Sequence, residues 1–83
     1  MYLGIIDVKA LDDFILQLTF ENREVRQFDM KSYLQRGIFM ELQDVRQFNR
    51  VKVSFDSIEW PNGADLDPEL LYDESKAVEV IDD

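Results

Sequence analysis

The residues of this sequence with the types and spacing for chemistry lie between Trp60 and Tyr72. Carboxylates occupy alternate positions at Asp65, Asp67 and Glu69, and such acids on an extended segment can bind a hard cation such as Ca²⁺ or Mg²⁺. Each acid also has a structural role to fill: Asp67 as a helix N-cap, Glu69 beside the helix dipole, and Asp65 as an acceptor for turn amides. We adopt the structural interpretation and predict no metal site and no cofactor, because a calcium loop needs more ligands than this spacing offers.

A small binding pocket beside a turn is the second chemistry that this stretch suggests. Trp60 and Tyr72 would supply its aromatic walls, and Asn62 and Asp65 would supply its polar groups. These four are the candidate binding residues. The alternative is that Trp60 fills the core and its indole N–H donates to a carbonyl. The sequence leaves both interpretations open.

Residues for catalysis are largely missing. The chain contains no His and no Cys, which removes the commonest acid–base group at neutral pH, thiolate chemistry and disulfides. The glycines are isolated, so there is no phosphate-binding loop. A Ser-His-Asp nucleophile is excluded because no His accompanies the serines, which are Ser32, Ser54, Ser57 and Ser75. We therefore predict no catalytic residues and a protein that is not an enzyme.

Local signals around the candidate residues indicate a hairpin followed by a helix. Residues 51–55 and 58–60 alternate in polarity and predict two strands, joined by a turn at Asp56-Ser57. Pro61-Asn62-Gly63 predicts the next turn. Asp67 followed by Pro68 predicts the N-cap and first residue of a helix that ends near residue 73, and a last strand or tail covers 77–81.

The first half of the chain predicts an antiparallel meander. Residues 4–10, 14–20 and 24–28 read as its three strands. We expect Asn22 to adopt the left-handed conformation in the second turn. Because Val25 and Phe28 differ in parity, we also expect a bulge or a strand end in the third strand.

Short helices are expected next, over residues 30–35 and 39–48. Asp29 would cap the first, and Asp44 would interrupt the second. The predicted fold class is α+β: an N-terminal antiparallel three-stranded meander with short helices on one face and a second small hairpin, in a single domain of residues 1–83. The predicted core is Phe14, Leu16, Leu18, Phe20, Phe39, Leu42, Phe48, Val51, Val53, Ile58 and Trp60.

The net charge of −9 is concentrated in the last third of the chain. Residues 56–83 hold 10 of the 18 acids and 1 of the 9 bases, so the rest of the chain sums to zero. Such a surface repels membrane and nucleic-acid phosphates and attracts a basic protein. A basic stretch at Arg36, Arg46, Arg50 and Lys52 nets too little charge to bind nucleic acid alone. The alternative is that the acids only keep a small protein soluble.

Several motifs carry a family resemblance over nearly the whole chain. Phe39-x-x-Leu42, Phe48-x-x-Val51 and above all the segment Ile58-x-Trp60-Pro61-Asn62-Gly63-x-Asp65-Leu66-x-Pro68-Glu69-x-Leu71-Tyr72 resemble the bacterial domain of unknown function (DUF) 2442 family. A departure is Glu21-Asn22, where the family often shows an Asp-Gly turn. The resemblance implies a small α+β domain and no established activity. It also implies a small partner protein, DUF 4160, encoded beside many relatives in an arrangement like a toxin–antitoxin pair.

Together these observations predict a cytoplasmic, non-enzymatic protein-interaction module that resembles an antitoxin. Its acidic C-terminal third would bind a small basic protein, for which a DUF 4160-type protein is the candidate. We expect no membrane association and no binding of nucleic acid by the chain alone, and exposed edge strands are compatible with a homodimer. The alternative function is a ligand- or metal-binding domain that uses the turn between Trp60 and Tyr72.

Overall fold

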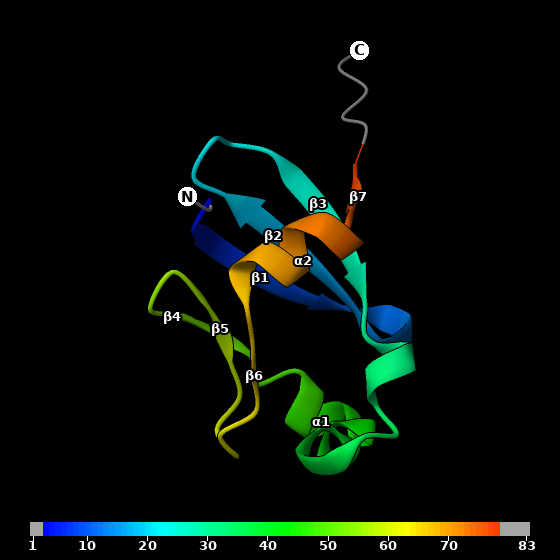
Figure 1. Ribbon diagram of the computed structural model, residues 1–83. Coiled ribbons are helices and arrows are strands. Elements are labelled where there is room, and N and C mark those ends of the chain that lie inside the picture. The colour runs from blue at the N-terminus through cyan, green and yellow to red at the C-terminus, as the bar shows by residue number, and fades with distance from the viewer. Residues whose placement is uncertain (1–2, 79–83) are drawn as a thin grey trace.

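A computed structural model describes residues 3–78 of the chain, and it is built from two antiparallel sheets linked by short helices (Figure 1). The first sheet has the strand order β1-β2-β3-β7 and the second has the order β4-β5-β6. The predicted α+β fold class, with its N-terminal meander and second small hairpin, is confirmed. No helix within the described residues has the length and apolar character needed to cross a bilayer.

The first sheet is the predicted meander with one strand added. Strands β1 (Ile5–Leu11), β2 (Ile15–Phe20) and β3 (Val25–Asp29) pair in chain order. Strand β7 (Lys76–Ala77) then pairs with β3, so the chain returns to the first sheet at its C-terminal end. The part of the expected last strand beyond residue 78 lies outside the described residues.

Two local features of this sheet differ from what the sequence favours. Strand β3 pairs with β2 without a shift and ends at Asp29, directly after Phe28, so of the two expected features it has the strand end and not the bulge. The register irregularity lies in β1, between Ile5 and Asp7. The bulge leaves Ile6 46% exposed, because an extra residue reverses which side chains face the core. In the turn after β2 the left-handed residue is Arg23, with φ 73°. Asn22 instead accepts a hydrogen bond from the backbone N–H of Glu24 at 3.0 Å.

The helices after the meander are short, as expected. A 3-10 helix, η1 (Asp12–Phe14), forms the turn between β1 and β2, and two more follow β3: η2 (Lys31–Tyr33) and η3 (Gly37–Gln43). Helix α1 (Val45–Phe48) begins directly afterwards, where the Asp44 carboxylate accepts from the Arg46 N–H at 3.0 Å. The predicted interruption at Asp44 is therefore confirmed.

The second sheet and the last helix follow from the turn signals of the sequence. Strands β4 (Lys52–Ser54), β5 (Ser57–Glu59) and β6 (Asp65–Leu66) form the sheet. Helix α2 (Pro68–Glu74) then lies over the first sheet (Figure 1). Its predicted cap is confirmed, since the Asp67 carboxylate accepts from the Glu69 N–H at 2.8 Å. A capping bond of this kind contributes about 1 kcal/mol.

The hydrophobic core joins the two sheets and the helices. Most of the predicted core residues are buried, and Phe14, Phe39 and Val51 pack against the core while partly exposed. Val53 is an incorrect prediction at 37% exposed, because it lies on β4, at the edge of its sheet. The buried apolar side chains that the prediction omitted are Ile5, Phe28, Met30, Leu34, Ala64 and Leu71.

Candidate functional site

Trp60 is a core residue. Its side chain is 1% exposed, and its indole N–H donates to the backbone carbonyl of Phe48 at 2.9 Å. The rings of Phe39 and Phe48 lie 6.4 and 6.2 Å from it, centroid to centroid. An aromatic ring this enclosed stabilises the fold and presents no surface to a ligand.

Asn62 holds the turn between β5 and β6. Its side-chain oxygen accepts from the Ala64 N–H at 3.0 Å, and Gly63 takes the left-handed conformation with φ 93°. The amide nitrogen lies 3.3 Å from a carboxylate oxygen of Glu41 and 3.4 Å from the Ile38 carbonyl oxygen. The turn is therefore fastened to η3, which explains why this position carries an Asn.

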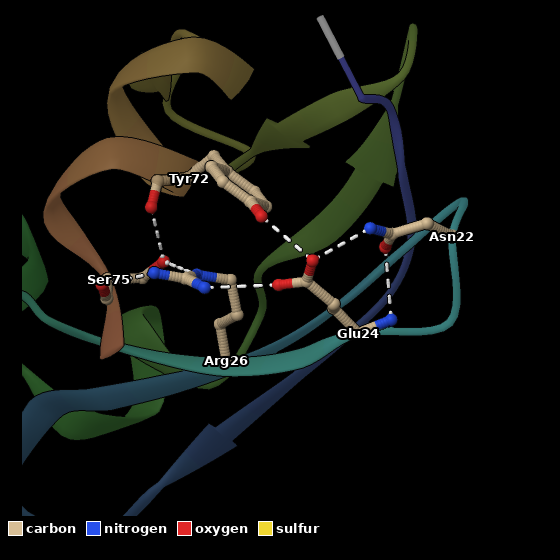
Figure 2. A network of polar contacts seen from close by, with 5 residues as sticks. All are labelled: Asn22, Glu24, Arg26, Tyr72 and Ser75. Atoms are coloured by element: carbon tan, nitrogen blue, oxygen red, sulfur yellow. Dashed lines mark hydrogen bonds and ion pairs between the residues drawn. The ribbon is translucent and has the colours of Figure 1, made fainter. Parts of the chain in front are cut away.

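Tyr72 belongs to a network of polar contacts between α2, β3 and the segment before β7 (Figure 2). Its hydroxyl donates to Glu24 Oε1 at 2.8 Å, and the Arg26 guanidinium lies over its ring at 4.3 Å from the centroid. Arg26 also pairs with Glu24 Oε2 at 3.1 Å and donates through Nε to Ser75 Oγ at 2.7 Å. The Ser75 hydroxyl in turn donates to the Tyr72 carbonyl at 2.9 Å.

The network couples the ionisation of its members. Hydrogen bonds from Tyr72 and Asn22 lower the pKa of the Glu24 carboxyl. The bond to Glu24 raises the pKa of the Tyr72 hydroxyl, because ionising the phenol would lose its donor beside a carboxylate. Since each polar group here bonds to another, the arrangement fastens α2 and β7 to β3.

Asp65 is the candidate residue that stays at the surface. It is exposed on β6 and lies directly across from Glu59 of β5 in the pairing register. No group of three or more acids among residues 3–78 is arranged to hold a metal ion. The four candidate binding residues thus occupy different settings: Trp60 in the core, Asn62 in a turn, Tyr72 in the polar network and Asp65 on the surface.

A groove of about 390 Å³ lies beside Asp65 on the second sheet. The residues that line it come from all three strands and from the start of α2, and the charged ones are Glu59, Asp65 and Asp67. Apolar atoms come from Ile58, Leu66, Pro68 and Phe55. None of the residues that line it is basic.

Phe55 is the residue of this groove that the sequence did not single out. It is 97% exposed at the tip of the β4–β5 hairpin, with φ 49°. The sequence assigned it to a strand because it continues the alternation of Val51 and Val53, and placed the turn one residue too late. Only the pairing of Ser54 with Ser57 shows that Phe55 and Asp56 form the loop.

The hairpin tip is fixed against the first sheet. The Asp56 carbonyl accepts from the Ile5 N–H at 2.8 Å, and the Gly4 N–H donates to Glu21 Oε1 at 2.6 Å. A Cβ on Gly4 would lie 3.1 Å from the Asp56 Cβ, so the hairpin tip packs closely on the segment before β1. Phe55 is therefore presented from a fixed position.

One comparison with known proteins identifies a relationship. A family model described as "Protein of unknown function (DUF2442)" matches residues 5–77. Neither the search of curated proteins nor the search of solved structures found a match.

Proposed function

This chain belongs to the DUF2442 family, and from that premise we propose that it is a non-enzymatic protein-interaction module whose acidic segment, residues 56–78, binds a basic partner protein. The observation that carries the proposal is the exposure of this charge. Six carboxylates of the segment are exposed, those of Asp56, Asp65, Asp67, Glu69, Asp73 and Glu74. Exposed charges of one sign accelerate association with a surface of the opposite sign.

Few acids of the acidic segment form an ion pair with a base of the same chain. Among the described residues, the only ion pair that joins one of its acids to a base is that of Glu59 with Lys52, at 3.9 Å. The other ion pairs lie in the first 50 residues, at Glu24, Asp13, Asp29 and Asp44. Asp67 and Glu74 accept internal hydrogen bonds, from the Glu69 N–H at 2.8 Å and the Tyr33 hydroxyl at 2.7 Å. Because both donors are uncharged, a basic partner would meet these acids without first displacing a base of the same chain.

The partner that we propose is a small basic protein of the DUF 4160 type, which would make this chain antitoxin-like and place the complex in a bacterial cytoplasm. The test is co-expression of the chain with the small protein encoded beside it, followed by size-exclusion chromatography at low salt. We expect one co-eluting complex. Separate elution of the two proteins at low salt would refute the proposal.

Paired charge variants show whether the acidic segment carries the binding. Glu69→Gln with Asp73→Asn removes two exposed acids from the segment, and Asp7→Asn with Asp12→Asn removes two exposed acids from the first half. The net charge changes equally in both. We expect the first pair to weaken the complex and the second to leave it nearly unchanged; equal effects would mean that net charge alone governs association.

A further inference from the structure

The conformation of the β4–β5 hairpin makes Phe55 an unexpected residue at its tip. Ser54 pairs with Ser57, so Phe55 and Asp56 form a two-residue loop, and both have positive φ, at 49° and 65°. This is the backbone of a type I′ turn, for which Asn-Gly is the favoured sequence. A bulky aromatic residue is disfavoured in the left-handed region, and here it makes almost no contacts in return, being 97% exposed. Folding therefore does not explain Phe55.

The groove beside Phe55 has a matching feature. Glu59 and Asp65 face each other across β5 and β6, and like charges in directly opposed positions destabilise a sheet. Asp67 adds a third carboxylate to the lining, next to the apolar atoms of Leu66. The Ser57 hydroxyl is engaged with the Leu66 carbonyl, and Asp67 caps α2. Glu59 has one carboxylate oxygen 3.9 Å from Lys52 Nζ, which leaves its other oxygen and the exposed Asp65 carboxylate to accept from an incoming donor.

An arginine side chain fits this combination better than other cations do. A guanidinium stacks on an aromatic face and donates in a planar fork to carboxylates, whereas a lysine ammonium is a compact point charge. The carboxylates repel the phosphates of nucleic acid and of anionic lipid.

We infer that the groove is the docking site for an arginine-bearing, extended segment of the partner protein, with one guanidinium stacked on the Phe55 ring and bonded to the Glu59 and Asp65 carboxylates. The inference rests on the proposed function and adds the residue that anchors the partner protein. Phe55 is then the hot spot of the interface: a rigid, exposed aromatic residue, surrounded by groups that contribute less.

The experiment uses two ten-residue peptides, one alternating Arg with Gly and one alternating Lys with Gly, titrated into the ¹⁵N-labelled protein at low salt. The expected result is binding of the Arg peptide with amide shift changes centred on residues 54–59 and 65–67, and weaker binding of the Lys peptide. Phe55→Asn, which suits the turn, should weaken binding of the Arg peptide about tenfold. It should also remove the preference for Arg over Lys.

Two controls separate the anchor from general charge attraction. Val45→Ala removes apolar surface from a residue that is 56% exposed on α1, and should change the affinity less than twofold. Asp65→Asn, in the groove, should weaken binding more than Asp73→Asn, which is an equal change of charge on α2 outside it.

Two results would overturn the inference. If the peptides bind equally, with shifts spread over the whole acidic segment and no effect of Phe55→Asn, the acidic segment attracts bases without an anchor and the proposed function survives. If the Arg peptide does not bind at low salt, the groove is not an arginine site, and co-expression with the neighbouring protein still decides the proposed function separately.

Discussion

Replacing Phe55 by Asn should stabilise the protein. A left-handed residue with a side chain costs roughly 1–2 kcal/mol, and Asn tolerates this region much better than Phe does. Complete burial of a Phe side chain is worth about 1.5–3 kcal/mol. Since Phe55 is 97% exposed, almost none of that stabilisation is present to be lost. The net expectation is a gain of about 0.5–1 kcal/mol in the free energy of unfolding.

Urea unfolding measures this gain directly. With a slope of about 1 kcal/mol per molar, the midpoint should rise by roughly 0.5–1 M, and the melting temperature by a few degrees. Phe55→Ala is the matched control, because it removes the same ring and keeps a Cβ in the left-handed region, so its stability should change by less than about 0.5 kcal/mol. Destabilisation by both substitutions would refute the reasoning, since it would show that the ring makes contacts in solution.

Three further outcomes follow from other parts of the structure. Asp67→Ala removes the N-cap acceptor of α2 and should lower the free energy of unfolding by about 1 kcal/mol in thermal melts. Trp60→Phe deletes the indole donor and leaves the buried Phe48 carbonyl with only the longer bond from the Val51 N–H at 3.4 Å, so urea unfolding should show a loss of about 1–3 kcal/mol. The pKa of Glu24 is lowered, chiefly by its hydrogen bond from Tyr72, so the stability it contributes is present above its unfolded pKa, near 4.5, and is lost as pH falls through the folded pKa. Glu24→Gln should accordingly flatten the acid limb of stability against pH relative to wild type; an unchanged limb would mean that this bond is not made in solution.

The elements with strong local signals were predictable from the sequence. Alternation over residues 14–20 predicts a strand from one segment alone, and β2 forms there except at Phe14, which lies in η1. Asp67-Pro68 marks a helix start by cap chemistry alone. The bulge was not predictable in the same way. Whether Ile5 or Ile6 faces the core depends on how β1 pairs with β2, and alternation in one strand cannot show where a register shift falls.

The candidate functional residues were also only partly predictable from local sequence signals. The segment from Trp60 to Tyr72 looked functional because it gathers unusual residues, and the structure gives Trp60, Asn62 and Tyr72 internal partners. Phe55 looked like an ordinary strand residue because it continues an apolar alternation. Its exposure arises from a loop only two residues long, which is a property of strand pairing and not of composition.

Binding of a basic protein by the acidic segment is tested most directly by the salt dependence of the complex. Raising the salt from about 0.1 M to about 1 M shortens the screening length from about 10 Å to about 3 Å. The dissociation constant of the complex with the neighbouring small protein, measured by isothermal titration calorimetry, should rise at least tenfold over this range. A dissociation constant that does not change with salt would contradict binding through the acidic segment.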